Sequence, residues 1–511
     1  MTYAQIAMTV VVAVLIGVIL FIACVAAAIR KRKNTQTGEG PLSDFYNGGR
    51  KTGPFVLAMT MLTTYLSASS FLGGPGLAYE KGLAWVYLAV IQIPVIFLTL
   101  GILGKKLGTV SRAVGAVTVN DVLRARYESP LLVVLCSLSL IVFSLIQITA
   151  QIKGGAIVFQ TITGLNYERA LMLFGALVVL FTVLGGFAGQ SVANTLFGIL
   201  MVVGCVTLMT LLTRASSNGN VAETMTILHP GWDSVSGADG TLTPAYMFSF
   251  WVLVGFGVLG LPQTAACGAS YRDTKALNKA IPLGTLLLAF VILSIHLVGA
   301  YAPLLISMPE VKILLGGSVG TDYVLPGIVL KYMSPLAAGL FFAAPLAAVL
   351  SSVNALLLSS SAALMKDLYV NYLLKDKSRA EEPSFRTRAA LATFLIATGL
   401  VFVAWHLLQI EPFGVRSIVK LNLTALGGLE CAFFFPLVGG LYWRKATAEG
   451  AVYGLLAGVV LYVYLIWNDF RPAGFLPVVP ALMLSGAVFW FFSRFGSGKD
   501  QEPPETFFPR R

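Results

Sequence analysis

The stretch Thr63-Thr64-Tyr65-Leu66-Ser67-Ala68-Ser69-Ser70-Phe71-Leu72-Gly73-Gly74-Pro75-Gly76 decides the fold of this chain. It lies within an apolar segment long enough to span a bilayer, but its hydroxyl-rich centre and the glycines and proline that follow make a poor uniform helix. In lipid, a helix breaks only where the freed backbone groups face protein or a polar cavity. A break leaves carbonyls on one half-helix and amides on the other, which suit a cation and an anion respectively. The alternative is a continuous helix whose small residues pack against a neighbouring helix.

The composition of the chain indicates a helical membrane protein. Its 511 residues are 57% hydrophobic and 11% charged, with a mean hydropathy of +0.82. Soluble domains carry roughly 25% charged residues. The net charge of +12 is typical of cytoplasmic loops in such proteins and does not by itself indicate a nucleic-acid partner. The five cysteines fall in apolar segments without the spacing of a metal site, so we interpret them as core residues.

Hydropathy predicts thirteen transmembrane helices, with the N-terminus outside and the C-terminus in the cytoplasm. The first apolar run, 5–29, is followed rather than preceded by basic residues (Arg30–Lys33), which argues against a signal peptide. With thirteen spans, most of the 35 lysine and arginine residues fall on the inner side, as the positive-inside rule requires. The remaining spans are predicted at 54–78, 83–107, 130–159, 168–187, 191–213, 245–267, 279–305, 335–365, 389–410, 416–441, 447–468 and 475–493.

The predicted spans divide the chain into two sets of five with additions at both ends, and we expect no soluble domain. The expected units are an extra helix and basic loop (1–53), the first five-helix repeat (54–213), an outer loop (214–244), a second five-helix repeat (245–441), two further helices (442–493) and a disordered cytoplasmic tail (494–511).

A second interrupted span supports internal symmetry. Residues 245–267 contain Gly255, Gly257, Gly260 and Pro262, and this segment begins the second set of five spans as 54–78 begins the first. Because five is odd, the second set crosses the membrane in the opposite sense, which predicts an inverted repeat with a discontinuous first helix in each half.

The third helix of the second set carries hydroxyls at helical spacing. Ala348, Ser351 and Ser352 are related as i, i+3 and i+4 and therefore share one face. Two hydroxyls with a nearby carbonyl are hard oxygen donors suited to an alkali cation. The alternative is that the hydroxyls donate to carbonyls of their own helix.

With these features, nearly the whole chain resembles the sodium/solute symporter family, whose fold is the leucine-transporter-like five-plus-five inverted repeat. The resemblance is densest at Leu57–Thr60 through Gly82, Asn120–Leu123, Ser249–Val254 through Tyr271–Asp273, Lys366–Tyr369, and Asn422 with Gly427–Glu430.

The resemblance implies a sodium site between the first broken helix and the eighth core helix. The implied ligands are the backbone carbonyls of Thr63 and Leu66, with Ala348, Ser351 and Ser352 completing the set. Relatives with a second sodium site use an aspartate and hydroxyls where this chain has Asn194, Asn354 and Ala355, with Phe197 at the place of a frequent glutamine. We therefore expect one sodium ion per substrate and no organic cofactor.

The resemblance also implies alternating-access import of a small anionic solute through a bacterial inner membrane. Pantothenate is the expected substrate, with sialic acid, proline, a monocarboxylate or a sugar as alternatives. A carboxylate suits the amide end of the second half-helix, where Ser67, Ser69 and Ser70 supply hydroxyls. Further candidate contacts are Gln92, Gln151, Trp251 and Gln263. We expect the lipid bilayer and this solute as the partners of a monomer that binds no nucleic acid.

Each of three ionisable residues inside spans has more than one possible role. Glu430 is structural, paired near the inner end, or a gate residue; Lys153 attracts an anion or extends to the headgroups; His296 packs in the core or acts in function.

Three other classes are weighed against a transporter. A membrane enzyme is disfavoured because three scattered histidines form no catalytic set. A nutrient sensor would usually add a signalling domain, and a channel would lack the occluded site of an inverted repeat.

Overall fold

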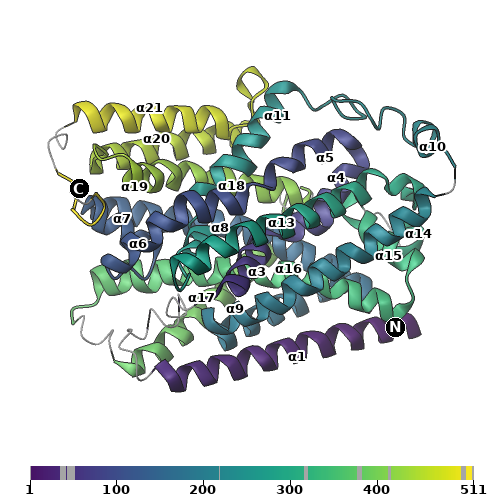
Figure 1. Cartoon of the computed structure of the whole chain (residues 1–511), viewed down its shortest axis with the longest axis horizontal. Coiled ribbons are helices and arrows are strands. Elements are labelled where there is room, and N and C mark those ends of the chain that lie inside the picture. Colours follow the sequence, from purple (N-terminus) through teal and green to yellow (C-terminus); the bar gives the residue numbers. More distant parts are fainter. Residues whose placement is uncertain are drawn as a thin grey trace.

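A computed structural model describes residues 2–34, 42, 46, 52–217, 219–315, 320–376, 382–411, 416–496 and 502–508. All regular elements in these ranges are helical (Figure 1), and one isolated β-bridge joins Thr52 to Tyr271. Side chains of 27–34, 183–189, 383 and 386 are outside the description, so the basic cluster Arg30–Lys33 is known only as the end of a helix.

The α-helices are α1 (Tyr3–Asn34), α3 (Pro54–Tyr65), α4 (Gly74–Lys81), α5 (Leu83–Ala89), α6 (Lys105–Ala113), α7 (Val119–Tyr127), α8 (Pro130–Thr163), α9 (Tyr167–Ser216), α10 (Val221–Leu228), α11 (Pro244–Trp251), α12 (Pro262–Gly268), α13 (Thr274–Ala300), α14 (Met308–Leu315), α15 (Val324–Tyr332), α16 (Pro335–Ala362), α17 (Pro383–Leu407), α18 (Ile418–Phe434), α19 (Gly440–Tyr442), α20 (Ala448–Trp467) and α21 (Val478–Phe495).

Shorter π and 3-10 segments are η2 (Ser69–Gly73), η3 (Val90–Gln92), η4 (Phe97–Gly104), η5 (Val252–Phe256), η6 (Gly257–Gly260), η7 (Ala302–Leu304), η8 (Thr321–Tyr323), η9 (Ala363–Leu373), η11 (Phe435–Gly439) and η12 (Pro472–Gly474).

The long helices lie roughly alongside one another, with α16 in the centre of the bundle (Figure 1). In the apolar part of the span that contains α16, 83% of the residues are buried, whereas in α17 at the periphery 17% are buried. Helices α3, α8, α9 and α17 pack around α16, and α18 packs on α8. The helices at the two ends of the chain flank this core: α1 lies along α9 and α16, whereas α20 and α21 pair with each other beside α18.

The first span is broken at the predicted stretch. Helix α3 ends at Tyr65, Leu66 is extended (ψ 140°), and the chain resumes in η2 and α4 at 64° to α3. The freed amides find side-chain acceptors: Ser67 N donates to Ser70 Oγ (3.3 Å) and Ala68 N donates to Gln151 Oε1 (2.8 Å) on α8. These two bonds satisfy backbone groups that lipid would leave unpaired, and the alternative of a continuous helix is wrong.

The second break has a different cause. Leu261 precedes Pro262, and a residue before proline is driven from helical to extended backbone, here ψ 114°. Proline also has no amide to satisfy, so it opens α12 without a capping side chain. The two halves of this span, Pro244–Gly260 and Pro262–Gly268, meet at 55°. The prediction of a discontinuous first helix in both halves is therefore confirmed.

The predicted number of thirteen spans is not settled by the described residues. Ten helices there are long and apolar enough to cross a bilayer, or twelve if each bent pair forms one span. The difference lies in α9, which runs for 50 residues over the two spans predicted at 168–187 and 191–213. At 1.5 Å per residue, a helix of that length is about twice as long as a bilayer core is thick.

The C-terminal segment differs from the disordered tail that its composition predicts. Residues 497–501 and 509–511 lie outside the described part, but in 502–508 the Phe507 ring is 1% exposed. Phe508 lies 4.3 Å from the ammonium of Lys106, and both rings face the guanidinium of Arg126. Aromatic rings that pack on cations give this polar segment a docking energy that its composition does not reveal.

We expect Gln151→Leu to destabilise the protein by about 1–3 kcal/mol, because the Ala68 amide would lose its acceptor in a buried site. Gln151→Glu keeps an acceptor oxygen of the same reach, but because the position is completely buried it should retain the stability only at a pH where the carboxyl is protonated. Thermal unfolding in detergent measures both. Equal melting of Gln151→Leu and the unsubstituted protein would contradict this capping role.

Candidate functional site

The first break meets α16 at the hydroxyl pair that the sequence singled out. Ser352 Oγ donates a hydrogen bond to the Leu66 carbonyl over 2.7 Å, and both residues are buried. Ser351 Oγ is completely buried without a hydrogen-bond partner. Neither hydroxyl donates to its own helix, so the alternative of back-bonding is wrong for this pair. The Ser351 hydroxyl, next in sequence to the one that contacts the break, therefore offers a buried oxygen of the kind that coordinates an alkali cation.

The other two candidate ligands are also completely buried. Thr63 and Ala348 are both 0% exposed. Thr63 Oγ1 donates within its own helix, to Met59 O at 3.0 Å and Thr60 O at 3.3 Å. The hydroxyl thus bonds within α3, and the group of Thr63 that the prediction assigns to the cation is its backbone carbonyl.

A cavity of about 60 Å³ adjoins the break. At roughly 15 Å³ for each water, it has room for about four water molecules. Of the predicted substrate contacts, Ser67, Ser69, Ser70, Gln92 and Gln263 line it, and Ser352 of the sodium candidates does so too. Its other walls come from Thr64, Tyr65, Gly74, Trp85, Gln147, Phe250, Val254, Leu261, Thr264, His296, Val419, Asn422, Leu423 and Leu426.

The polar groups of this cavity are neutral and linked in chains. Gln263 Nε2 donates to Gln147 Oε1 (3.4 Å), and Gln147 Nε2 donates to Asn422 Oδ1 (3.2 Å). On another wall, the Tyr65 hydroxyl lies 3.3 Å from Gln92 Oε1. Gln263 Oε1 remains buried without a partner. Amide and hydroxyl groups of this kind can exchange hydrogen bonds with a polar solute that itself carries hydroxyls and an amide.

Two predicted contacts lie elsewhere. Gln151 accepts a hydrogen bond from the Ala68 amide and does not line the cavity, although its Nε2 is buried without a partner. The Trp251 ring packs against Tyr87, with centroids 5.3 Å apart, and is also absent from the lining. The interruption in 245–267 predicts a site but not which side of the helix faces it, and the side that faces the cavity carries Phe250 and Val254 in the first half and Gln263 and Thr264 in the second.

Sequence reasoning missed Tyr65, Gln147, Asn422 and His296 as lining residues. Gln147 precedes Gln151 by four residues on α8, so helical spacing alone could have identified it. His296 Nδ1 lies 2.8 Å from Ile292 O, and because a carbonyl only accepts, Nδ1 carries the proton. The other nitrogen, Nε2, is therefore an acceptor at the Gly74 side of the cavity; a Cβ on Gly74 would lie 2.7 Å from it.

Lys153 is held near the start of α18. Its Nζ donates to Arg416 O over 2.8 Å, and it interacts electrostatically with Asp322, whose Oδ2 accepts a weak bond from Ile418 N (3.4 Å). Burial raises the pKa of Asp322, and the positive charge of Lys153 opposes that shift. Lys153 therefore belongs to a polar cluster at one end of α18 and does not line the cavity.

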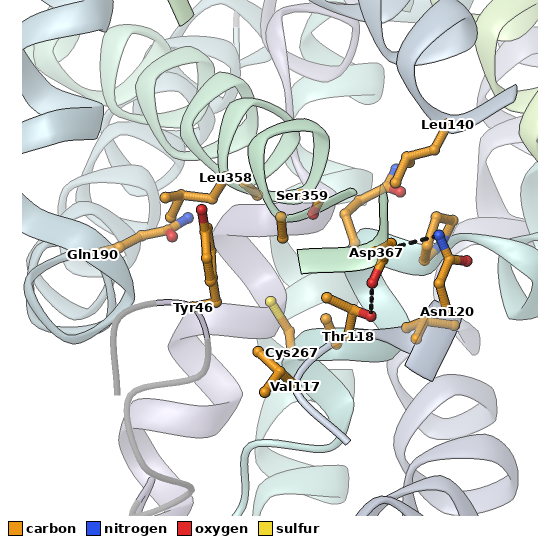
Figure 2. Close-up of a pocket in the computed structure, with 16 residues that line it drawn as sticks. Tyr46, Val117, Thr118, Asn120, Leu140, Gln190, Cys267, Leu358, Ser359 and Asp367 are labelled. Carbon is orange, nitrogen blue, oxygen red and sulfur yellow. Dashed lines mark hydrogen bonds between the residues drawn. The ribbon is translucent and has the colours of Figure 1, made fainter. Parts of the chain in front are cut away.

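Figure 2 shows a second cavity, of about 50 Å³. Gln263 lines both cavities. Asp367 accepts hydrogen bonds from Thr118 Oγ1 (2.5 Å) and Asn120 Nδ2 (2.8 Å) in its wall. These contacts join the two motifs around Asn120 and Asp367, which are far apart in the sequence. Gln263 is thus the residue that the two cavities share.

Neutral residues occupy the positions expected to decide a second cation site. Asn194 on α9 and Asn354 on α16 are almost completely buried, and neither amide has a hydrogen-bond partner for its oxygen or nitrogen. Phe197 and Ala355 are buried as well. Amide oxygens can coordinate a cation, but these positions bring no carboxylate to offset its charge.

Sequence comparison finds similar proteins over most of the chain. The chain is 42% identical to the sodium/pantothenate symporter of Escherichia coli over 93% of this chain and 94% of that protein. It is 37% identical to the sodium/pantothenate symporter of Haemophilus influenzae over 89% and 90%. A sodium/proline symporter of Staphylococcus saprophyticus is 24% identical over 89% and 88%.

Solved structures share the fold. That of a Na⁺-coupled sialic acid symporter matches with a TM-score of 0.74 at 17% identity, covering 95% of this chain and 98% of the other. MHP1, a nucleobase-cation-symport-1 family transporter, matches at 0.51 and 16% identity, covering 90% and 96%. The sequence model described as the sodium:solute symporter family matches residues 45–458. The chain belongs to the sodium:solute symporter family.

Proposed function

We propose that this chain imports pantothenate together with sodium. The observation that carries the proposal is the 2.7 Å contact between Leu66 O and Ser352 Oγ, because it places hard oxygen donors at the break in the first helix. Two relatives of 42% and 37% identity, both named for pantothenate, support the choice of substrate. Another small solute of the family is the alternative.

Sodium would be held by five oxygens, as the sequence predicts: the carbonyls of Thr63, Leu66 and Ala348 and the hydroxyls of Ser351 and Ser352. The orphaned Ser351 hydroxyl and the extended backbone at Leu66 support this set. An ion there would tie α3 to α16 in place of the present Ser352 hydrogen bond. Sodium binding would thereby favour one arrangement of the broken helix over others.

Pantothenate would place its carboxylate at the serines of the second half-helix. Since the Ala68 amide already donates to Gln151, the donors left for the carboxylate are chiefly the hydroxyls of Ser67, Ser69 and Ser70. Gln92 and Gln263 would meet the amide and hydroxyls, with Tyr65, Gln147 and Asn422 added by the structure.

Transport would proceed by alternating access. We assign the N-terminus to the outside and the C-terminus to the cytoplasm of a bacterial inner membrane, following the distribution of lysine and arginine. The helices 54–213 and 245–441 would form the two inverted repeats, and one chain would suffice because the cavity is lined within it. Rocking of one helix set against the other would expose the site to each side in turn.

We expect Ser351→Ala and Ser352→Ala each to raise the sodium concentration for half-maximal uptake roughly ten- to hundredfold, since a hydrogen-bond-strength contact to a charge contributes about 1.5–3 kcal/mol. Sodium titrations of pantothenate uptake into proteoliposomes measure this. Thr63→Ala is the control, because its hydroxyl is bonded within α3 and its carbonyl persists. Unchanged sodium dependence in Ser352→Ala would disprove the assignment.

Ser67→Ala and Ser70→Ala should weaken pantothenate transport while sodium binding without substrate persists. Pantothenol, which replaces the carboxylate with an alcohol, should compete poorly because it cannot accept charge-assisted hydrogen bonds from the serines. A competition assay with labelled pantothenate tests both points. Strong inhibition by pantothenol would remove the reason for placing a carboxylate at these residues.

The stoichiometry should be one sodium per pantothenate, since Asn194 and Asn354 supply no charge for a second ion. One cation with one monovalent anion moves no net charge, so the membrane potential would not drive the overall cycle. A tenfold sodium gradient, about 1.4 kcal/mol, then supports roughly tenfold accumulation. The measurement is accumulation in vesicles at a fixed sodium gradient with a varied potassium diffusion potential. Accumulation that rises with inside-negative potential, with a sodium Hill coefficient well above one, would indicate a second sodium.

A further inference from the structure

Glu430 on α18 is a carboxyl group that neither the sodium site nor the cavity uses. It is 0% exposed, and both of its oxygens are buried without a hydrogen-bond partner. It follows Leu426, which lines the cavity, by one helical turn. From Glu430 the chain continues to Gly440, whose carbonyl accepts from Arg126, and Arg126 faces the C-terminal Phe507 and Phe508. Glu430 therefore lies between the cavity and the end of the bundle that holds the C-terminus.

The carboxyl rests on the backbone of the second broken helix. A Cβ on Gly257 would lie 2.1 Å from Glu430 Oε2, and a Cβ on Gly260 would lie 2.9 Å from the Phe434 backbone. These two glycines bound η6, directly before the break at Leu261. The absence of side chains at both positions lets α18 pack directly on this segment, with Glu430 against it. Any tilt of the segment must therefore change the surroundings of Glu430.

The ionisable groups near Glu430 are uncharged types. Tyr65 from α3, Tyr462 from α20 and Cys431 of α18 itself are close enough to interact with it electrostatically. The segments η2, η5, η6 and η11, which also contact α18, contain no titratable residue.

Cations on the remaining neighbours are directed elsewhere. On α8, Lys153 donates to Arg416 O, and Arg494 lies in the last turn of α21. The salt bridges found among the described residues do not include Glu430. An unpaired carboxylate in such a place costs several kcal/mol, so the group must hold a proton or a cation while it is enclosed.

We propose that Glu430 is a proton-binding site coupled to the second broken helix. It is neutral while η6 packs on α18. When that contact opens toward the C-terminal end, water reaches the carboxyl, its O–H bond breaks, and the proton passes to water and leaves a carboxylate. Closure requires the same proton to return from the same side. The proton thus makes reclosing depend on the pH of that side without net proton transport.

The test rests on the proposed function for one of its two measurements. Sodium-driven pantothenate uptake is measured in proteoliposomes with the outer pH fixed and the inner pH raised in steps. Uptake by the unsubstituted protein should fall as the inner pH rises. At inner pH values where Glu430 is mostly ionised, the fall should approach about tenfold for each pH unit, as expected for one titrating proton. Glu430→Gln, a permanently neutral isostere, should lose most of this dependence. Glu430→Asp still titrates, so it should keep the slope, but its midpoint should shift because the shorter side chain places the carboxyl in different surroundings. Glu223→Gln on the exposed surface of α10 is the control.

The second measurement needs no substrate. Infrared spectra of the purified protein in its closed, sodium-bound form should contain a protonated-carboxyl band that Glu430→Gln lacks. If pantothenate is not the substrate, uptake is absent in every variant while this band still reports the proton.

Several results would overturn the proposal: no such band, an inner-pH profile of Glu430→Gln that equals the unsubstituted one, or a raised half-saturating sodium concentration in Glu430→Gln. The last result would make Glu430 a sodium ligand. Size-exclusion chromatography of each variant separates these outcomes from misfolding. If Glu430→Gln does not fold, a shifted pH profile in Glu430→Asp supports the proposal and an unchanged profile counts against it.

Discussion

The structure depends on one constraint: a backbone that is interrupted inside a membrane must find partners for its freed amides and carbonyls. At the first break, Gln151 accepts from the Ala68 amide, Ser70 accepts from the Ser67 amide, and Ser352 donates to the Leu66 carbonyl. Two of these partners come from other helices, α8 and α16. The interruption is thus stable only inside this bundle, and two of the side chains that it requires, Ser70 and Ser352, also line the cavity.

The two breaks solve the same problem with different chemistry. The second has no capping side chain: Pro262 removes one of the freed amides and restricts Leu261 to extended backbone. The first is held by polar side chains that could instead bind an ion or a solute, whereas the second is a covalent feature of the chain. This difference fits a division of roles in which the first break provides ligands and the second provides a hinge.

The sequence was sufficient for the features that are local. The cluster of hydroxyls and glycines from Thr63 to Gly76 identified the first break, and the i, i+3, i+4 spacing identified the face of α16 that meets it. It was insufficient where the orientation of a helix decides. Gln151 and Trp251 have suitable chemistry, but α8 turns the first toward a backbone amide and α11 turns the second toward Tyr87. Docking of Phe507 was missed since it depends on cations distant in sequence.

Gln263 links the break in the second span to both cavities. It is the second residue of α12, directly after the break at Leu261, and it lines both the cavity beside the serines and the cavity that contains Asp367. A rotation about Leu261 would move α12 and Gln263 with it, whereas Asp367 is fixed by Thr118 and Asn120 on the opposite wall. One wall is therefore attached to a hinge and the other is hydrogen-bonded in place. A path between the cavities would open at Gln263, whereas the serines and carbonyls proposed to hold the solute and the ion belong to the first break.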